Sequence, residues 1–372
     1  MAKHAYLSAS ASHRWLACPP SAKLCAEQDD RASPYAKEGT DAHSLCEYKV
    51  EKALGRKAED PTENLDYYSE EMESCAEGYC SFVMEQIAEA RKHCTDPVVM
   101  VEQRLNFSRW VENGFGTGDC VIIADDMLQI IDYKHGLGIL IEARHNPQLM
   151  CYALGALEIF DGIYDISTVR MTIYQPRRDN ISTWEVSKEA LLAWADEVLK
   201  PTARLAYEGK GEFLAGDHCQ FCKVKASCRK RAEYNLELAQ YDFAPPATLD
   251  ETEIAAILPK LDHLISWGND VKEYALQQAL SGVEYEGFKV VAGRSTRRYA
   301  DEAAVAEAVT KAGYDPYEQK LLGITAMTSL LGKKRFEEIL GGLITKPQGK
   351  PTLVPDSDKR PPINTAQDDF ND

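Results

Sequence analysis

The sequence predicts an α/β fold: a central mixed sheet flanked by helices, followed by a mostly helical C-terminal region. Short β-branched runs occupy the middle of the chain, and longer segments with helical periodicity lie between and around them. Hydrophobic residues make up 44% and charged residues 27%, as in ordinary globular domains. With 372 residues the chain is long enough for about two domains of roughly 150 residues each.

Two helices are expected before the first strand. Residues 38–54 have helical periodicity, with Thr40 as a candidate N-cap. A second helical segment covers 70–93 and ends before Pro97, because the residue before a proline avoids the helical region. Further upstream, Cys18-Pro19-Pro20 ends any helix there, since proline interrupts the backbone hydrogen bonds.

Five strands and two more helices are expected next. The first strand is rich in β-branched residues, and a glycine-rich turn at 113–118 leads into a hairpin. Asn146-Pro147 starts a helix, with Asn at the cap and Pro in the first turn. In order, we expect strands at 98–107, 119–123 and 127–134, a helix to about 160, strands at 168–174 and 181–186, and a helix at 188–207.

The last third of the chain divides into further segments. A helical stretch follows Cys228 to about residue 239, and Phe243-Ala244-Pro245-Pro246 predicts a boundary. Residues 248–345 are expected to be mostly helical, with a short strand pair around 288–291. From Lys346 the chain has several prolines and few large apolar residues, which predicts a disordered tail. The expected domains are 1–243, 244–345 and the tail 346–372.

The charge balance excludes a generic nucleic-acid coat protein, which would be basic. Forty-two basic residues against fifty-nine acidic ones give a net charge of −17. A nuclease remains compatible with this balance, because it concentrates carboxylates around a divalent metal. No apolar run approaches the ~20 residues of a membrane helix, and the N-terminus lacks the apolar stretch of a secretion signal. We therefore expect a cytoplasmic protein without membrane association, whose eleven cysteines stay reduced and raise the question of metal binding.

Two carboxylates and one amine are expected at one end of the central hairpin. Asp119 opens one strand, and Asp132 and Lys134 close the other. Because side chains alternate along a strand, Asp132 and Lys134 project from the same side while Tyr133 points away. Carboxylates bind hard cations such as Mg²⁺, and an ammonium can position water or stabilise developing negative charge. The pattern alone also fits ordinary charges at a strand end, but the apolar neighbours predict central strands, where unpaired charges are costly.

Three cysteines within ten residues predict a metal site. Cys219, Cys222 and Cys228 have the spacing C-x2-C-x5-C, and a tetrahedral thiolate site needs a fourth ligand. Cys18 is the best candidate, because its proline-flanked setting is loop-like. Thiolates bind both zinc and iron–sulfur clusters, so the spacing leaves the two open. The other cysteines are expected to be packed thiols: Cys25, Cys46, Cys75, Cys80, Cys94, Cys120 and Cys151.

Two segments resemble the PD-(D/E)XK nuclease superfamily, specifically its RecB-like branch: Gly116-Thr117-Gly118-Asp119 and Ile131-Asp132-Tyr133-Lys134-His135-Gly136. The resemblance covers roughly residues 8–235 and implies a restriction-endonuclease-like core. It implies that Asp119 and Asp132 are metal ligands and that Lys134 is the catalytic base or charge stabiliser. Many relatives have Glu where this chain has Asp132, which puts the metal geometry in doubt.

The same resemblance implies further site residues. His43, in Glu38-Gly39-Thr40-Asp41-Ala42-His43, matches the family's metal-binding histidine. Gln148 and Tyr152 match a pair that contacts DNA and orients the lysine, and their spacing of four puts both on one helix face. Glu102 is a weaker candidate, at a strand position where relatives often have an acidic residue.

The cysteine arrangement is similar to the [4Fe–4S] staple of RecB-like nucleases, with Zn²⁺ as the alternative. The resemblance implies a Mg²⁺- or Mn²⁺-dependent DNA nuclease of a phage-encoded type, acting in replication or recombination in the bacterial host cytoplasm. We expect an exonuclease acting on single-stranded DNA or DNA ends. The alternative is a catalytically silent nuclease-fold module that binds DNA or a protein partner.

Local basic patches could follow a phosphate backbone despite the acidic total. They contain Arg177, Arg178, Lys223, Lys225, Arg229, Lys230, Arg231, Arg294, Arg297, Arg298, Lys333, Lys334 and Arg335. Trp15, Phe221 and Tyr174 are candidate stacking aromatics or core residues. The acidic tip at 368–372 is typical of an inert tail, with docking of a replication or recombination protein as the alternative.

Overall fold

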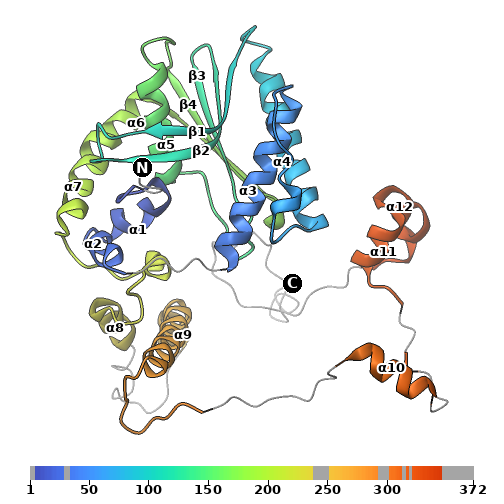
Figure 1. The fold of residues 1–372 in the computed structure, drawn as a ribbon. Helices are drawn as coiled ribbons and strands as arrows, with labels where there is room; N and C mark the ends of the chain where they lie inside the picture. Colours follow the sequence, from blue (N-terminus) through green and yellow to red (C-terminus); the bar gives the residue numbers. More distant parts are fainter. Residues whose placement is uncertain are drawn as a thin grey trace, which may run out of the picture. The chain divides into compact units, whose positions relative to one another are not determined.

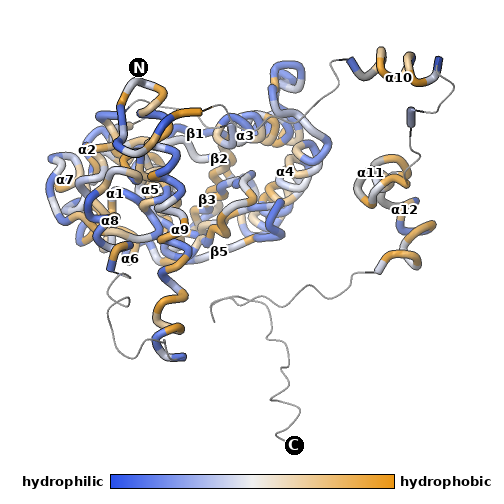
Figure 2. Tube along the Cα trace, turned by 90° about the horizontal axis from the view of Figure 1, so that it is seen from below, coloured by the Kyte–Doolittle hydropathy of each residue, from blue (hydrophilic) through white to orange (hydrophobic). Residues whose placement is uncertain are grey.

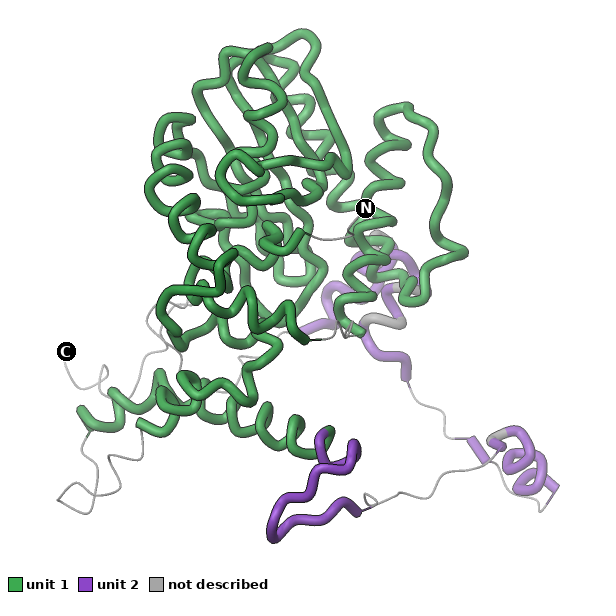
Figure 3. The backbone as a smooth tube through the Cα atoms, turned by 60° about the vertical axis from the view of Figure 1, so that its left-hand side comes forward, with its two compact units in different colours: residues 1–277 green, residues 278–372 purple. Residues whose placement is uncertain are grey.

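The computed structural model describes residues 5–28, 34–237, 251–291, 301–311, 316–317 and 321–345 (Figure 1). The chain divides into two compact units, Met1–Gln277 and Gln278–Asp372, which are coloured separately in Figure 3. The predicted boundary at 243–246 and the predicted tail from 346 lie outside the described residues.

A five-stranded mixed sheet forms the centre of the first unit (Figure 1). Strands β3 and β4 are parallel, and the other three neighbouring pairs are antiparallel. Helix α5 (Pro147–Phe160) makes the crossover that a parallel pair requires. The predicted α/β fold is therefore confirmed. In sheet order the strands are β1 (Val98–Asn106), β2 (Phe115–Ala124), β3 (Met127–Tyr133), β4 (Thr168–Gln175) and β5 (Asn180–Ser187).

Helices α3 (Pro34–Ala53) and α4 (Glu70–Ala90) cover one face of the sheet. Their buried side chains form an apolar cluster, the α3/α4 cluster: Leu45, Cys46, Val50, Met72, Val83, Ile87, Cys120, Ile122, Ile131 and Tyr133 are among its members. The prediction that Thr40 caps α3 is wrong. The helix begins at Pro34, a residue suited to a first turn, and the Thr40 hydroxyl donates to the Ala36 carbonyl inside it.

The opposite face is covered by α5 and the helical run from Lys188 to Glu208. That run consists of α6 (Lys188–Trp194), the π-helical turn η4 (Ala195–Leu199) and α7 (Lys200–Glu208). Three short N-terminal helices join this face: η1 (Ala9–Ala11), α1 (Ser12–Ala17) and α2 (Ser21–Ala26). The Asn146 side chain accepts hydrogen bonds from the amides of Gln148 and Leu149, so the predicted cap is present. Strands β2 and β3 between the layers are largely apolar (orange in Figure 2).

Two helices follow the cysteine segment. The first, α8 (Arg229–Leu236), contains Arg231, whose guanidinium is buried and pairs with Asp270 of α9 (Glu251–Leu280). Asp270 also pairs with Lys225 at 2.8 Å. A buried charge needs a partner, and here these ion pairs connect α9 to α8 and to the segment before it, within the first unit.

The second unit contains α10 (Glu302–Lys311), α11 (Ile324–Leu331), α12 (Lys333–Leu340) and the short turn η7 (Gly341–Leu343). Residues 288–291 form no regular structure and Phe288 is 85% exposed, so the strand predicted there is wrong. Residues 292–300, which follow directly, lie outside the described part of the chain. Among the described residues, no helix has both the length and the apolar character needed to cross a bilayer.

Candidate active site

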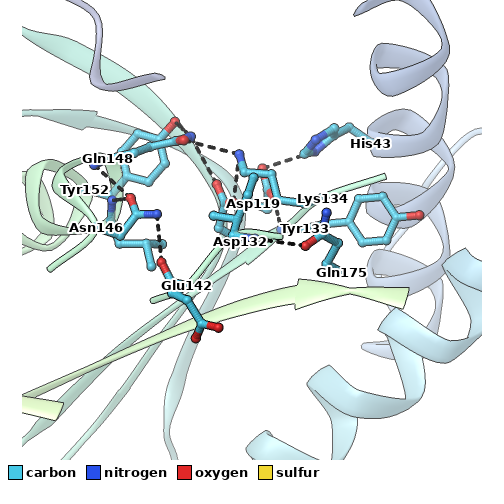
Figure 4. A network of polar contacts seen from close by, with 12 residues as sticks. His43, Asp119, Asp132, Tyr133, Lys134, Glu142, Asn146, Gln148, Tyr152 and Gln175 are labelled. Carbon is cyan, nitrogen blue, oxygen red and sulfur yellow. Dashed lines mark hydrogen bonds and ion pairs between the residues drawn. The ribbon is translucent and has the colours of Figure 1, made fainter. Parts of the chain in front are cut away.

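The hairpin of β2 and β3 brings Asp119, Asp132 and Lys134 together at one end of the sheet (Figure 4). Lys134 Nζ lies 2.8 Å from Asp132 Oδ2. Tyr133 between them points into the α3/α4 cluster, as strand alternation predicts. Asp119 Oδ2 accepts a hydrogen bond of 2.6 Å from the Tyr133 amide, so this carboxylate is fixed to the neighbouring strand.

His43 reaches the same place from α3. Its Nδ1 lies 3.2 Å from Asp119 Oδ1, and its ring packs edge-on against Tyr133 with 5.5 Å between ring centroids. Glu102 of β1 completes the group, since one ligand atom from each of His43, Glu102 and Asp119 lies within 4.8 Å of the others. The weaker candidate Glu102 therefore belongs to the site by position.

Glu102 lies where β1 and β2 exchange the faces of the sheet that their side chains occupy. Regular alternation would put Val101 and Leu105 on one face, yet Val101 packs in the α3/α4 cluster and Leu105 in the cluster on the α5 side. Glu102 has a φ of 49°, a left-handed conformation that is strained for a residue with a side chain. The register also leaves Glu102 and Asp119 unpaired between Val101↔Cys120 and Gln103↔Gly118. The distortion frees both carboxylates for the site.

Helix α5 supplies the remaining polar groups. Lys134 Nζ donates to Gln148 Oε1, and Gln148 Nε2 donates to Asp132 Oδ1, both at 3.2 Å. The same amide donates to the Tyr152 hydroxyl at 3.0 Å, so Tyr152 acts on Lys134 only through Gln148. Gly116 makes this packing possible, because a Cβ there would lie 2.6 Å from the Tyr152 ring.

The charges of the site are strongly coupled. Burial raises the pKa of Asp132, an effect that the nearby Lys134 ammonium only partly offsets. Burial and the neighbouring Asp119 carboxylate raise the pKa of Glu102 to about 7. Burial acts against protonation of His43, but its charge attraction to and hydrogen bond with Asp119 outweigh it and raise the pKa of His43 to about 8. Three carboxylates in one buried place therefore create a demand for positive charge.

The side chains fit a hard divalent cation. Carboxylate oxygens are ligands typical of Mg²⁺ and Mn²⁺ sites, and the one imidazole is a ligand more typical of zinc or iron. Apart from its ion pair with Lys134, Asp132 Oδ2 is buried and has no hydrogen-bond partner among the described residues. The residues whose ligand atoms lie together and would hold the cation are His43, Glu102 and Asp119. Asp132, also predicted as a ligand, is not part of this group: its two oxygens contact Lys134 and Gln148.

The four cysteines predicted as a metal site line one small cavity. Cys219 lies on η5 (Asp217–Phe221), Cys222 follows it, and Cys228 precedes α8. Cys18 reaches the same cavity from the end of α1, although about 200 residues of chain separate it from Cys219. Four thiols around one cavity fit either an iron–sulfur cluster or a zinc ion, so the structure leaves this alternative open.

Two further residues near these cysteines are not predicted from the sequence. Cys25 was expected to be a packed thiol, but its Sγ lies 3.7 Å from Cys222 Sγ and accepts a hydrogen bond from the Lys223 amide. His218 also lines the cavity, with Nε2 at 3.8 Å from Cys219 Sγ. Sequence proximity was the available signal, since Cys25 follows Cys18 within one short segment and His218 directly precedes Cys219.

A family model described as "Protein of unknown function (DUF2800)" matches residues 4–361. The chain belongs to the DUF2800 family. A solved structure entitled "Crystal structure of SSO0001" is also similar, at 15% sequence identity over 50% of this chain and 95% of that chain, with a TM-score of 0.21. Because this TM-score is low, we take the fold of this DUF2800 member from its own sheet topology.

Several basic and aromatic residues considered for nucleic-acid contact have other roles in this DUF2800 chain. Trp15 is fully buried and Tyr174 is 9% exposed, so both are core residues, whereas Phe221 is 61% exposed. Arg177 pairs with Glu38 and Glu71. Outside the described part of the chain lie Arg294, Arg297, Arg298, the side chains of Lys333 and Lys334, and the acidic tip at 368–372.

Proposed function

We propose that this DUF2800 protein is a deoxyribonuclease of the PD-(D/E)XK type that depends on Mg²⁺ or Mn²⁺. One observation carries the proposal: Asp119, Asp132 and Lys134 converge at the end of one hairpin, with His43 and Glu102 beside them. Binding alone does not require two acids and an amine in this arrangement. Buried opposite charges that converge in this way are typical of a catalytic site.

The side chains have separate roles in this proposal. His43, Glu102 and Asp119 would hold the cation, with Asp132 as a further ligand implied by the resemblance, and the cation would supply Lewis-acid polarisation of the scissile phosphate and a water nucleophile at neutral pH. Asp132 and Asp119 outweigh burial and raise the pKa of Lys134, so its ammonium stays charged. Lys134 therefore stabilises negative charge on the phosphate rather than removing a proton. Gln148 holds Lys134 and Asp132 in place through its amide.

The cysteine cavity would hold a [4Fe–4S] cluster, with zinc as the alternative. Cys18, Cys219, Cys222 and Cys228 would be the ligands, and the group would join the N-terminal helices to the segment before α8. Its part in the proposal is structural, because it closes a long loop of the nuclease unit. Purification without oxygen distinguishes the two: a brown protein with bound iron supports the cluster, and a colourless one with stoichiometric zinc supports the alternative.

The resemblance to RecB-like nucleases also implies a substrate class. We propose single-stranded DNA or DNA ends, in phage replication or recombination within a bacterial cytoplasm.

A nuclease assay tests the activity directly. Labelled single- and double-stranded DNA is incubated with the full chain under reducing, anaerobic conditions, with Mg²⁺, Mn²⁺ or EDTA. We expect cleavage that requires the metal and falls by roughly 10²- to 10³-fold in Lys134→Ala, the range for losing a charge-stabilising group. Lys49→Ala is the matched control. Lys49 also forms an ion pair with a carboxylate, but its partner is Glu73 of α4, outside the candidate site. If the wild type binds DNA but never cleaves it, the chain is a silent binding module instead.

A further inference from the structure

Arg104 and Phe115 form a stacked pair next to the candidate metal ligands. The Arg104 guanidinium carbon lies 3.7 Å from the centroid of the Phe115 ring. Arg104 is exposed, and within the described part of the chain it forms no ion pair with a carboxylate. One face of the guanidinium therefore covers the ring, and its charge is not neutralised by a neighbour.

The strand register places this pair just beyond the point where β1 and β2 exchange faces at Glu102 and Asp119. Arg104 pairs with Thr117, and Phe115 with Asn106, so all four share one face of the β1–β2 hairpin. Leu105 and Gly116 occupy the other face, which packs against α5 and the N-terminal helices. Arg104 and Phe115 consequently face away from α5 and are not covered by its packing.

The distance to the carboxylates corresponds to a nucleotide step. Arg104 follows Glu102 by two residues, and Thr117 precedes Asp119 by two. Two residues extend at most roughly 7 Å, and less across the left-handed backbone at Glu102. A nucleic-acid strand rises about 3.4 Å per nucleotide, and more when extended, so a base at Arg104 would lie one or two nucleotides from a phosphate at the carboxylates.

We propose that Arg104, backed by Phe115, is a stacking platform for one base of a single DNA strand, one or two nucleotides from the scissile phosphate. A planar guanidinium stacks on bases of any sequence, and its charge attracts the adjacent phosphate. The inference rests on the proposed nuclease function, because that function places a phosphate at the carboxylates.

The chain contains a matched control pair. Arg109 lies over the ring of Trp110 at 5.0 Å, but its guanidinium pairs with Glu158 at 3.0 Å. Arg109 is therefore an arginine on an aromatic ring whose charge is already neutralised and which is not on the face that continues from Glu102.

Binding of fluorescein-labelled single-stranded oligodeoxynucleotides to the full chain tests the platform. Ca²⁺ replaces Mg²⁺ or Mn²⁺, and one abasic residue is moved along the strand. Stacking is worth about 1–3 kcal/mol per base, so we expect a window of positions where the missing base weakens wild-type binding by about tenfold. Arg104→Ala should weaken binding of the intact strand by a similar factor and lose the window.

Arg104→Lys separates stacking from charge, because lysine keeps the charge without the plane. We expect it to lose the window too, whereas Arg109→Ala keeps both affinity and window. Phe115 is partly buried, so the DNA binding of Phe115→Ala is compared with that of the wild type only if its thermal unfolding curve shows that it is folded. The platform is overturned if Arg104→Ala keeps the wild-type window, if Arg104→Ala weakens intact and abasic strands equally, or if no oligodeoxynucleotide binds.

Cleavage measured in parallel separates the two proposals. A wild type with an abasic window but no cleavage in Mn²⁺ contradicts the nuclease and leaves the platform standing. A wild type that cleaves DNA without any abasic window contradicts the platform alone.

Discussion

At the scale of single residues, Glu102 makes two unfavourable contributions to the free energy of folding. Its left-handed backbone conformation costs of order 1–2 kcal/mol for a residue with a side chain. Its carboxyl is also partly buried beside Asp119, which raises its pKa to about 7. The proposed cation would offset the cost of the carboxyl, so stability without metal and cation binding should respond in opposite directions to the replacement of Glu102.

Glu102→Gln tests this opposition. Without metal we expect unchanged or higher thermal stability, because the substitution removes a buried acid beside another carboxylate. With Mn²⁺ we expect at least a tenfold weaker affinity, on the order of what lost ligand support costs in metal sites. Differential scanning fluorimetry with and without Mn²⁺, beside calorimetric titration, measures both quantities.

Glu47→Gln is the control for this comparison. Glu47 is a carboxylate one turn along α3 from His43 and is outside the ligand group. An equal loss of Mn²⁺ affinity in both variants would show that Glu102 acts only through general charge.

His135 gives a pH dependence that can be worked out in sign. Its ring accepts or donates at Tyr133 Oη, 2.8 Å away, and faces Glu38 of α3, with Arg177 and Glu71 beyond. Burial, and then the Arg177 charge, lower the pKa of His135 below its ordinary value of 6.5. The unfolded chain therefore takes up this proton first as the pH falls.

The stability that neutral His135 contributes is present above about pH 6.5 and is lost as the pH falls further. In His135→Gln we expect a smaller loss of unfolding free energy between pH 7.5 and pH 5 than in the wild type, measured by urea denaturation at each pH. The exposed His93→Gln should follow the wild-type curve. Parallel curves for all three proteins would contradict the prediction.

The site residues illustrate what the sequence could predict at this scale. Asp119, Asp132 and Lys134 follow from strand alternation and hairpin pairing, because both are local rules. The place of Glu102 does not follow, since it depends on a face exchange that alternation forbids. Cys25 is a buried thiol, as predicted, but its contact with Cys222 could not be predicted because it joins positions 197 apart.

At the scale of elements, the contact between α5 and β1 depends on one glycine. A Cβ at Gly155 would lie 2.9 Å from Leu105 Cβ and 3.0–3.1 Å from backbone atoms of Leu105 and Asn106. Backbone cannot move aside as a flexible side chain can, so α5 would shift away from β1 and take Gln148 with it.

Gly155→Ala should therefore destabilise the protein by about 1–3 kcal/mol, despite the higher helix propensity of alanine. Gly39→Ala in α3 is the matched control, because nothing lies within 4 Å of its Cβ position. There we expect a stabilisation of up to about 1 kcal/mol. Chemical denaturation measures both, and a stabilised Gly155→Ala would show that the approach of α5 to β1 is not tight.

Element prediction succeeded where local chemistry decides. Asn146-Pro147 fixes the start of α5, and the apolar runs fix the five strands. It failed where local preference alone indicated a strand, as in the apolar segment around Phe288 that forms no strand. The start of α3 was placed late because the polar first turns carry no apolar periodicity, and Pro34 alone marks it.

At the scale of the whole molecule, the cysteine cavity brings together two segments of the first unit that lie far apart in the sequence. Cys18→Ser should remove one ligand and lower thermal stability, and protease should then cleave within the first helices before the sheet. Cys94→Ser is the control, because Cys94 lies after α4 and does not line the cavity.

Bound metal and limited proteolysis are measured together in this test. If Cys18→Ser keeps the full metal content and the wild-type digestion pattern, Cys18 is not a ligand. The order of elements in the first unit could be predicted from the sequence. The attachment of α9 through Asp270 could not, since its ion pairs with Lys225 and Arg231 leave no periodic pattern in the sequence.

The separation of the cavity's walls along the chain has a consequence for biosynthesis. A ribosome adding 5–20 residues per second needs about 10–40 s between making Cys18 and making Cys219. During that interval Cys18 has none of the other three cysteines that line the cavity. Delivery of the proposed cluster or zinc ion would therefore be a late event in maturation, after nearly two thirds of the polypeptide has been translated, and the yield of folded protein should depend on iron or zinc supply at that moment.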